Sequence, residues 1–326
     1  MEKIRLGIVG PGRIVHRVMT DLRQAEHIDV AAVASRSLER AQHAAKELNI
    51  QLAFGSYRDM ALSDAVDLVY VALPHPFHCE VAKLFLENGK HVIVEKPFAV
   101  NAREAREMVD CARAHGRFLL EAMWTRFFPM AQSLKAMIDA GEIGDIRRIT
   151  GDFAFNSKPD YSDRLFNREL AGGSLLDVGV YPLSLMCFYK GALPHRIQVL
   201  STKTVTDVDA MCAFQVQFAD GAVGQGFSAL DVTTEHTMMI YGTKAWVEIP
   251  NFWHACRFVV HRPGQAPEEH DFPPENEGFH HEFEYAAQCI LSGKTDQMVI
   301  PLEESVAIMQ AMDDMRAQMG VSYPME

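Results

Sequence analysis

The sequence predicts an α/β protein with two domains, a doubly wound parallel sheet followed by an α+β domain whose large open sheet is mainly antiparallel. In residues 1–121, short and nearly continuously apolar strands alternate with helices, which is typical of a parallel sheet covered on both faces. In residues 122–326, long strands of alternating polarity follow one another with hairpin turns between them. The length of 326 residues also favours two domains, and we place the boundary between residues 121 and 122.

The amino-acid composition and net charge exclude some classes of binding partner. Hydrophobic residues make up 48% of the chain, so it can bury full cores, and the net charge is −12 without a long run of Lys or Arg. Nucleic acids and anionic membrane surfaces both require a basic patch, so neither is expected as a partner. No apolar run approaches the roughly 18 residues of a membrane helix. Six scattered cysteines and an N-terminus that enters a strand at once predict reduced thiols and a cytoplasmic protein.

The elements of the first domain follow in chain order. Apolar strands are predicted at residues 4–9, 28–34, 66–73, 91–94 and 118–122. Helices are predicted at residues 13–26, 38–48 and 77–88, and a further helix begins after its N-cap, Asn101. Ligands bind such sheets at the carboxyl ends of the strands, so residues that directly follow a strand are the first candidates for a site.

The second domain is predicted as helices and long strands. Helices are expected at residues 130–140, from 175 onward, and at 278–291 and 302–318. Strands are expected at 146–155 and through 196–249, with turns at Asp220-Gly221 and Gly242-Thr243. An open sheet of this size needs a cover on its free face, so we expect a homodimer or higher homo-oligomer through this sheet.

The stretch GIVGPGRIV places Gly10 and Gly12 at the turn from the first strand into the first helix, followed by Arg13 and Ile14. A dinucleotide-binding fingerprint has this form, because glycines permit the tight turn and let a pyrophosphate approach the helix N-terminus. The third position is Val15, so the motif is incomplete, and a simple tight turn is the alternative. Its place at the start of a strand–helix–strand unit favours a Rossmann domain that binds a nicotinamide dinucleotide.

The end of the second strand indicates which dinucleotide. An NAD site usually carries an acid there, but this chain has Ser35, Arg36 and Ser37, with no acid before Glu39. A cation between two hydroxyls suits the 2′-phosphate of NADP, whereas a solvated arginine at a helix start is the alternative. NADP is therefore the predicted cofactor, with NAD less favoured.

The stretch HVIVEKPFAV ends a core strand with Lys96, between Glu95 and Pro97. The topology alone puts this ammonium group on the edge of the sheet where ligands bind. Pro97 restricts the backbone just past the lysine, in either the trans or the cis form. We expect Glu95, beside the cofactor, to be a structural partner and not a proton carrier.

Four motifs in this order and spacing, GPGRI, DLVYVALPHPFH, EKP and GGSLLDVGVY, resemble the Gfo/Idh/MocA oxidoreductases. The stretches LLEAMWTRFFP and GFHHEFEYAAQCILSGK are similar to the family's branch of dimeric dihydrodiol dehydrogenases and NADP-dependent D-xylose dehydrogenases. The resemblance covers nearly the whole chain, and the lysine of EKP with a later D-x-x-x-Y is its specific part.

The resemblance implies roles for individual residues. Lys96 would touch both the nicotinamide ribose and the substrate. Asp177 and Tyr181, four residues apart, would share one helical face of the second domain and point into the cleft. A further set of residues would line or support the cofactor: Leu73, Pro74, His75 and His78.

A physical argument supports a division of roles between these residues. A nicotinamide enzyme that oxidises an alcohol needs a base for the hydroxyl proton. A tyrosine with a pKa of about 10 costs roughly 4 kcal/mol to ionise at pH 7, and an ammonium about 4 Å away supplies attraction of similar size. We therefore expect Lys96 to set the electrostatics and Tyr181 to move the proton. The negative charge of Asp177 opposes ionisation of Tyr181 to a phenolate. We therefore assign Asp177 a role in orientation and hydrogen bonding and not in the main proton transfer.

Several other residues allow two interpretations. Arg126 either contacts a ligand or pairs with an acid, and His75 with His78 and Cys79 could suggest a metal, although their irregular spacing predicts none. His280, His281 and Glu282 are expected to form a solvated helix start. Five aromatic residues are either ordinary core or the lining of a substrate cleft that suits a cyclic diol or sugar ring: Trp124, Phe127, Phe128, Phe153 and Phe155.

These observations predict an NADP-dependent oxidoreductase that transfers hydride between nicotinamide C4 and a secondary alcohol or carbonyl of a sugar, polyol or trans-dihydrodiol. The alternative is a catalytically silent NADP-sensing regulatory protein of the same fold, which would have no need for Lys96 and Tyr181. A short-chain dehydrogenase is excluded because no Y-x-x-x-K pair follows the fingerprint.

Overall fold

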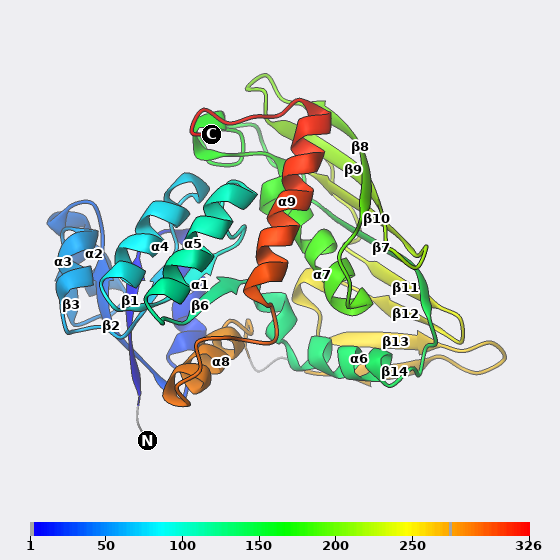
Figure 1. Cartoon of the computed structure of the whole chain (residues 1–326), viewed down its shortest axis with the longest axis horizontal. Coiled ribbons are helices and arrows are strands. Elements are labelled where there is room, and N and C mark those ends of the chain that lie inside the picture. The colour runs from blue at the N-terminus through cyan, green and yellow to red at the C-terminus, as the bar shows by residue number, and fades with distance from the viewer. Residues whose placement is uncertain (1–2, 274–275) are drawn as a thin grey trace. The chain divides into compact units, whose positions relative to one another are not determined.

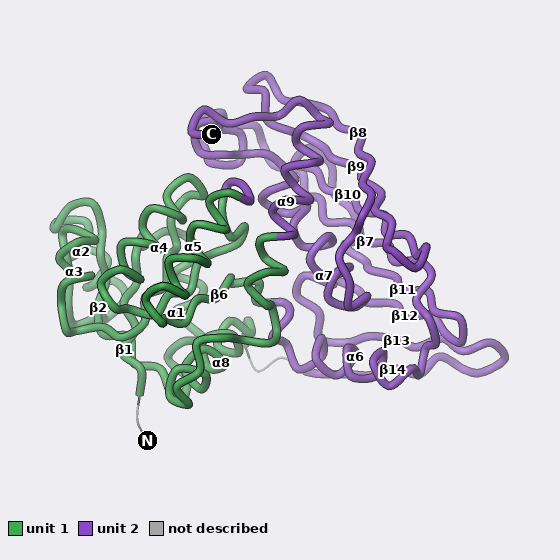
Figure 2. The backbone as a smooth tube through the Cα atoms, in the orientation of Figure 1, with its two compact units in different colours: residues 1–99, 103–124, 275–306 green, residues 100–102, 125–274, 307–326 purple. Residues whose placement is uncertain are grey.

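The computed structural model describes residues 3–273 and 276–326, and they form two compact units (Figures 1 and 2). Unit 1 comprises residues 1–99, 103–124 and 275–306, and unit 2 comprises residues 100–102, 125–274 and 307–326. Unit 1 therefore differs from the expected first domain by its later segment, residues 275–306. The reason is long-range packing, since the helix in this segment, α8, lies against α1 and β2.

Unit 1 is built on six strands: β1 (Ile4–Val9), β2 (Ile28–Ala34), β3 (Leu52–Phe54), β4 (Leu68–Val71), β5 (His91–Glu95) and β6 (Leu119–Ala122). Its helices are α1 (Arg13–Leu22), α2 (Leu38–Glu47), α3 (Tyr57–Leu62), η1 (His75–Phe77), α4 (His78–Glu87), α5 (Ala102–Ala114) and α8 (His280–Leu291). The short helix η2 (Trp124–Phe127) begins in unit 1, and its other residues belong to unit 2. Every strand pair is parallel and the order is β3-β2-β1-β4-β5-β6. This is the doubly wound order of a Rossmann domain, so the predicted fold class is confirmed.

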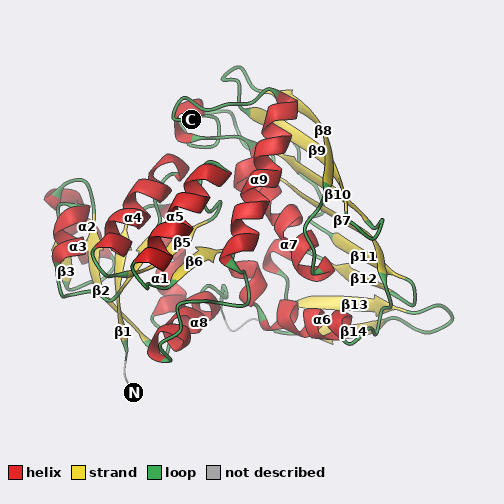
Figure 3. Ribbon diagram, in the orientation of Figure 1, coloured by secondary structure: helices red, strands yellow, loops and turns green. Residues whose placement is uncertain are grey.

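The central strands of unit 1 are largely buried because helices cover the sheet (Figure 3). All four residues of β4 are buried, as the apolar run in the sequence predicts. α4 and α5 are joined by an ion pair of 3.0 Å between Lys83 and Glu107. β3 and α3 were not predicted, because a three-residue strand and a six-residue helix leave little periodicity in the sequence.

Unit 2 is built on eight strands: β7 (Ile146–Ala154), β8 (Arg196–Lys203), β9 (Asp209–Gln217), β10 (Val223–Ala229), β11 (Met238–Gly242), β12 (Trp246–Ile249), β13 (Arg257–His261) and β14 (Glu268–Asp271). Its helical segments are α6 (Pro129–Asp139), η3 (Arg168–Leu170), the π-helical turn η4 (Leu175–Gly179), α7 (Val180–Lys190) and η5 (Phe252–His254). The last helix, α9 (Leu302–Met319), belongs mostly to this unit.

The sheet of unit 2 has the order β14-β13-β12-β11-β7-β10-β9-β8. All neighbours are antiparallel except β7 and β10, so the expectation of a mainly antiparallel sheet is confirmed. The hairpin turns predicted at Asp220-Gly221 and Gly242-Thr243 join β9 to β10 and β11 to β12. β13 and β14 extend the sheet beyond the predicted strands.

One face of this sheet is covered by α7, in which ten of the eleven residues are buried. Glycines on the strands make room for the helix: a Cβ on Gly151 would lie 3.4 Å from Pro182, and one on Gly224 would lie 2.9 Å from the Met186 sulfur. The segment Arg168–Lys190 is long and apolar enough to cross a membrane by composition, but 94% of its most apolar window is buried inside the protein. It therefore packs here as the core helix of unit 2.

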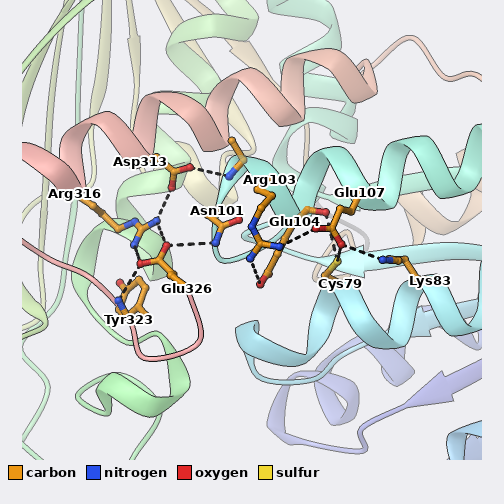
Figure 4. Close-up of polar contacts among 11 residues, drawn as sticks. Cys79, Lys83, Asn101, Arg103, Glu104, Glu107, Asp313, Arg316, Tyr323 and Glu326 are labelled. Carbon is orange, nitrogen blue, oxygen red and sulfur yellow. Dashed lines mark hydrogen bonds and ion pairs between the residues drawn. The ribbon is translucent and has the colours of Figure 1, made fainter.

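The end of α9 carries a buried polar network, shown at the left of Figure 4. Arg316 donates to Asp313 at 2.5 Å and to both oxygens of Glu326 at 2.6 and 2.9 Å, and its side chain is only 4% exposed. Asp313 also accepts from the backbone N–H of Ala102, and Glu326 from Asn101. Asn101 and Ala102, both of unit 2, are thereby connected to α9 and the C-terminal residue.

Candidate active site

The turn after β1 has the features of a pyrophosphate cradle. Gly10 has φ +84°, and a Cβ there would lie 2.6 Å from the side chain of Leu73 and 2.8 Å from the carbonyl oxygen of Ala72. A Cβ on Gly12 would meet nothing nearer than 3.9 Å, so the space above this glycine is open. Gly12 begins α1 without a side-chain cap, and no acid lies in the first turn. A helix N-terminus left open in this way fits a dinucleotide phosphate.

The turn after β2 carries the residues expected to select the cofactor. Arg36 is exposed between Ser35, which is buried, and Ser37. The Ser37 hydroxyl accepts from the backbone N–H of Arg40 at 3.4 Å and so caps α2. The positive charge of Arg36 acts on Tyr57, whose pKa is nevertheless raised because burial is the larger effect. Arg36 thus stands as an exposed cation at the carboxyl end of β2.

The turn after β5 is held by Glu95. Its carboxylate accepts the hydroxyl of Tyr70, from the neighbouring strand β4, and the backbone N–H of Lys96 at 3.2 Å. Lys96 is partly buried, and the bond from Lys96 to Pro97 is cis. The structure therefore places the lysine on the predicted edge of the sheet, with Glu95 as the structural partner of the turn.

His78 connects two of these turns. It is fully buried, with Nε2 2.8 Å from the carbonyl oxygen of Leu73 and Nδ1 3.0 Å from that of Pro97. Burial lowers the pKa of His78, and so does the charge of Lys96, which favours the neutral imidazole with one N–H to donate. Both ring nitrogens of His78 face backbone carbonyls, so the ring joins the turn after β4 to the turn after β5. His75 lies beside it, with ring centroids 5.9 Å apart.

The start of α8 packs against the Rossmann unit, which the sequence did not reveal. Phe279 stacks on Trp124 with centroids 4.1 Å apart, and its backbone N–H donates to the buried carboxylate of Asp21 at 2.8 Å. Phe283 packs edge-on against Tyr70 at 5.1 Å. The expectation of a solvated helix start is wrong for Glu282, which is only 1% exposed, because α8 returns to the Rossmann sheet instead of facing water.

In unit 2, Asp177 lies on the π-helical turn η4 and Tyr181 lies one turn later on α7. π-helical turns inside helices are frequent at functional sites. Asp177 is 4% exposed and accepts from Arg164 at 2.6 Å, a pairing that nothing in the sequence indicated. Tyr181 is 6% exposed.

The turn that carries Asp177 is held at its start by a buried acid, Asp209. Its carboxylate accepts from the Ser174 hydroxyl at 2.8 Å and from the backbone N–H of Leu175 at 2.7 Å. Burial raises the pKa of Asp209 to about 6. A Cβ on Gly173 would lie 2.2 Å from this carboxylate, so the second glycine of GGSLL lets the acid approach the helix.

Tyr181 borders a cluster of aromatic rings in unit 2. Phe153 lies 5.2 Å from the Tyr181 ring centroid and stacks on Trp253 at 5.1 Å. The Trp253 indole N–H donates to Nδ1 of His236 at 3.2 Å, and Nε2 of His236 lies 2.7 Å from the carbonyl oxygen of Ala154. These contacts fix the tautomer of His236 with its hydrogen on Nε2. The apolar wall predicted at Phe153 therefore also includes Trp253 and His236.

The other predicted substrate residues have different surroundings. Arg126 is fully buried, and its guanidinium donates to the Ser184 hydroxyl at 3.0 Å and to the Ser184 carbonyl oxygen at 2.6 Å. Full burial and these hydrogen bonds to Ser184 favour a packing role for Arg126 over a ligand contact. Phe127 is buried and Phe155 is half-buried. Trp124 lies in unit 1 with Phe279.

Comparison with known proteins decides the family. The pattern described as "Oxidoreductase family, NAD-binding Rossmann fold" matches residues 4–122, and the "GFO/IDH/MocA C-terminal domain" matches residues 131–248. The chain belongs to the Gfo/Idh/MocA family of oxidoreductases. The motifs GPGRI, EKP and GGSLLDVGVY therefore indicated the correct Gfo/Idh/MocA fold.

Individual relatives of this Gfo/Idh/MocA protein support the same branch. Trans-1,2-dihydrobenzene-1,2-diol dehydrogenases from Mus musculus and Homo sapiens are each 33% identical over 99% of this chain and 99% of their own length. The structure of aldose-aldose oxidoreductase from Caulobacter crescentus matches with a TM-score of 0.88 at 24% identity and covers 98% of both chains. A 3-ketoreductase from Actinomadura kijaniata, solved with NADP and TDP-benzene, has a TM-score of 0.85 at 25% identity, covering 97% of this chain and 98% of its own.

Proposed function

We propose that this protein is an NADP-dependent dehydrogenase that acts on a secondary alcohol of a ring diol, polyol or sugar. The observation that carries the proposal is the placement of Lys96 by Glu95 at the carboxyl end of β5, in a Rossmann unit with an open helix N-terminus at Gly12. A nicotinamide cofactor bound at this edge supplies the hydride chemistry. A silent sensor of NADP would need neither Lys96 nor the Asp177–Tyr181 pair.

Arg36 supports NADP over NAD. It is an exposed cation at the carboxyl end of β2, with no acid on the turn before α2. We expect R36A to weaken NADP about 10- to 100-fold, the value of lost charge-assisted hydrogen bonds, and to leave NAD nearly unchanged. Fluorescence titration of both cofactors measures this, with R40A, in the first turn of the following helix α2, as the control. Equal weakening of both cofactors would refute the assignment.

The catalytic roles are divided between charge and proton transfer. Lys96 favours negative charge on the reacting oxygen, and Tyr181 gives or takes the proton of the substrate hydroxyl. Asp177, held by Arg164, orients the helical turn that precedes Tyr181. The same arrangement serves both directions of the reaction.

Three substitutions test this division. K96M removes the ammonium and should lower turnover by about 10²-fold or more while the cofactor still binds. Y181F keeps the ring against Phe153 and should cost about 10²- to 10⁴-fold and remove the main pH inflection. D177N should be milder. Near-normal turnover in Y181F together with an inactive D177N would make the aspartate the proton carrier.

The substrate class follows from the aromatic wall. Phe153 and Trp253 present apolar ring faces next to Tyr181, which suits the flat face of a ring that carries vicinal hydroxyls. Relatives that cover 99% of this chain are named for a trans-dihydrodiol of benzene. A spectrophotometric screen of trans-dihydrodiols, cyclitols and aldoses with NADP and NAD tests the proposal. Absence of hydride transfer with every ring diol and sugar would overturn it.

We further propose a homodimer through the face of the unit 2 sheet that α7 does not cover. Arg148 lies over the Tyr241 ring at 5.4 Å and bonds to Gln225 at 2.9 Å, and the neighbouring Trp246 is 36% exposed. An interface on this face should bury at least about 1,000 Å². Light scattering at micromolar concentration should give a dimer that Y241D converts to monomers. A monomeric wild-type protein would contradict the proposal.

A further inference from the structure

Glu282 is a buried acid that the proposed reaction does not use. Its side chain is 1% exposed, and neither carboxylate oxygen has a hydrogen-bond partner among the described residues. An ionised carboxyl buried without partners costs several kcal/mol, so such a group is normally paired, protonated or functional. The burial of Glu282 without hydrogen-bond partners therefore calls for a structural or functional reason.

α8, the helix that carries Glu282, is held in place by aromatic contacts with Tyr70 and Trp124. Phe283, the next residue, packs edge-on against Tyr70 at 5.1 Å, and the hydroxyl of Tyr70 donates to Glu95. One turn earlier, Phe279 is fixed by its stack on Trp124 and by its hydrogen bond to Asp21. Glu282 thus lies between two anchored residues and cannot turn to solvent without undocking α8.

Glu95 is the acid whose negative charge acts on the pKa of Glu282. Burial raises the pKa of Glu282 well above its usual range, and the negative charge of Glu95 raises it further. Glu95 accepts hydrogen bonds from the Tyr70 hydroxyl and from the backbone N–H of Lys96. Hydrogen bonds to a carboxylate favour its ionised form, whereas Glu282 has no such donor. Of these two acids, Glu282 is the one whose surroundings favour the protonated form.

Several other charged groups around α8 are paired with one another. Arg17, from α1, pairs with Glu277 at 2.6 Å, and Asp21 accepts from Phe279. His27, before β2, pairs with Glu284. The remaining titratable groups on this part of α8 are His280, His281 and Tyr285, of which Tyr285 accepts from the backbone N–H of Met298. Among the described residues, no cation donates a hydrogen bond to Glu282.

We propose that Glu282 is a positioning residue for the turn Glu95-Lys96-Pro97: it holds a proton at neutral pH, so that Glu95 is the single negative charge that accepts from Tyr70 and Lys96. Ionisation of Glu282 at higher pH adds a second negative charge that repels Glu95. The repulsion loosens this turn and weakens the binding of NADP. The expected effect on cofactor binding rests on the proposed function, whereas the protonation of Glu282 does not.

The proton is tested first on the protein alone. A carboxyl that keeps its proton in the folded state lowers stability as pH rises from its ordinary pKa of 4.5 to its folded pKa. E282Q is neutral at every pH, so its Tm should rise relative to wild type by about 2 °C per pH unit across this window. E80Q, at an exposed glutamate of the same unit, should show a constant difference. A constant difference for E282Q as well would overturn the proposal.

A second measurement does not depend on the folding of a variant. Wild-type protein labelled with ¹³C at the glutamate carboxyls should show one carboxyl carbon that stays in its protonated position at pH 7, far above the ordinary glutamate pKa. If every glutamate carboxyl titrates in the ordinary range, Glu282 is ionised and the proposal fails.

The positioning role is tested by the pH profile of NADP binding. E282Q should match wild type near neutral pH and keep its affinity at alkaline pH, where wild type loses it. E282A should be less stable at every pH because it leaves a cavity. Identical profiles of E282Q and wild type, together with a proton on Glu282, would overturn the positioning role. Absence of NADP binding in wild type would instead count against the proposed function.

Discussion

Removal of Arg316 should destabilise unit 2 far more than removal of an exposed arginine. In Figure 4 its guanidinium lies between Asp313 and Glu326, with hydrogen bonds of 2.5, 2.6 and 2.9 Å to the two carboxylates. The Arg316 side chain is 4% exposed and those of its partners are 22% and 25% exposed. R316M keeps most of the side-chain volume but leaves two largely buried carboxylates without their shared cation.

Breaking a buried ion pair by removal of one partner typically costs about 3–5 kcal/mol. At an unfolding entropy of roughly 2.1 cal/mol/K per residue, this lowers the Tm of a chain of this size by about 4–7 °C if it unfolds as one unit. Calorimetry or thermal circular dichroism measures the shift. R316K keeps the charge but loses the two-point hydrogen bonding and should lie between wild type and R316M.

Arg147 supplies the matched control in the same unit. It lies 3.4 Å from Asp145, and the two side chains are 59% and 76% exposed. R147M should therefore change the free energy of unfolding by less than about 1 kcal/mol. Equal losses in R316M and R147M would show that burial of the Arg316 network does not determine its contribution.

The network also predicts a pH dependence. Burial favours the neutral form of Glu326, but hydrogen bonds from Arg316 and from the Tyr323 backbone outweigh it, and the net effect lowers the pKa of Glu326. Stability from this carboxylate is present above its ordinary pKa and is lost as pH falls through the folded value. The gap between wild type and R316M should narrow in acid, and a gap that widens there would refute the reasoning.

Three further predictions concern single positions. Asp209, whose pKa burial raises to about 6 from 3.8, should lower wild-type stability by up to about 3 kcal/mol as pH rises through that window, and urea unfolding of D209N should lack this slope. Glu303, whose pKa hydrogen bonds from Arg106 and Arg113 lower to about 2, should contribute less than about 1 kcal/mol because it is 54% exposed. Its contribution should vanish as pH falls from 4.5 towards about 2, so E303Q and wild type should converge in acid melts. G226A would place a Cβ 2.0 Å from the Phe214 ring and should cost about 1–3 kcal/mol in denaturant titration, whereas no cost would show that the ring can move aside.

The sequence by itself determined the features that depend on local pattern. Continuous apolar runs marked the strands of the Rossmann sheet, since a strand buried on both faces has no polar side. The positive φ of Gly10 and the place of Lys96 at the end of β5 follow from residue type and chain order within one strand–turn unit. For the same reason the hairpin turns at Asp220 and Gly242 were predicted correctly.

Only the tertiary structure decided which distant residues complete each half of the site. α8 carries Phe279 and Glu282 back to the Rossmann sheet after the whole of the second sheet has been formed. Asp209 reaches the turn of Asp177 from a strand 34 positions beyond Leu175, and His236 lies 82 positions from Ala154, whose carbonyl it contacts. These pairings depend on strand order and helix docking. The hydrophobic periodicity of the sequence does not predict either of them. Burial then sets the chemistry of each group, because an acid such as Glu282 keeps its proton only where the surrounding elements exclude water.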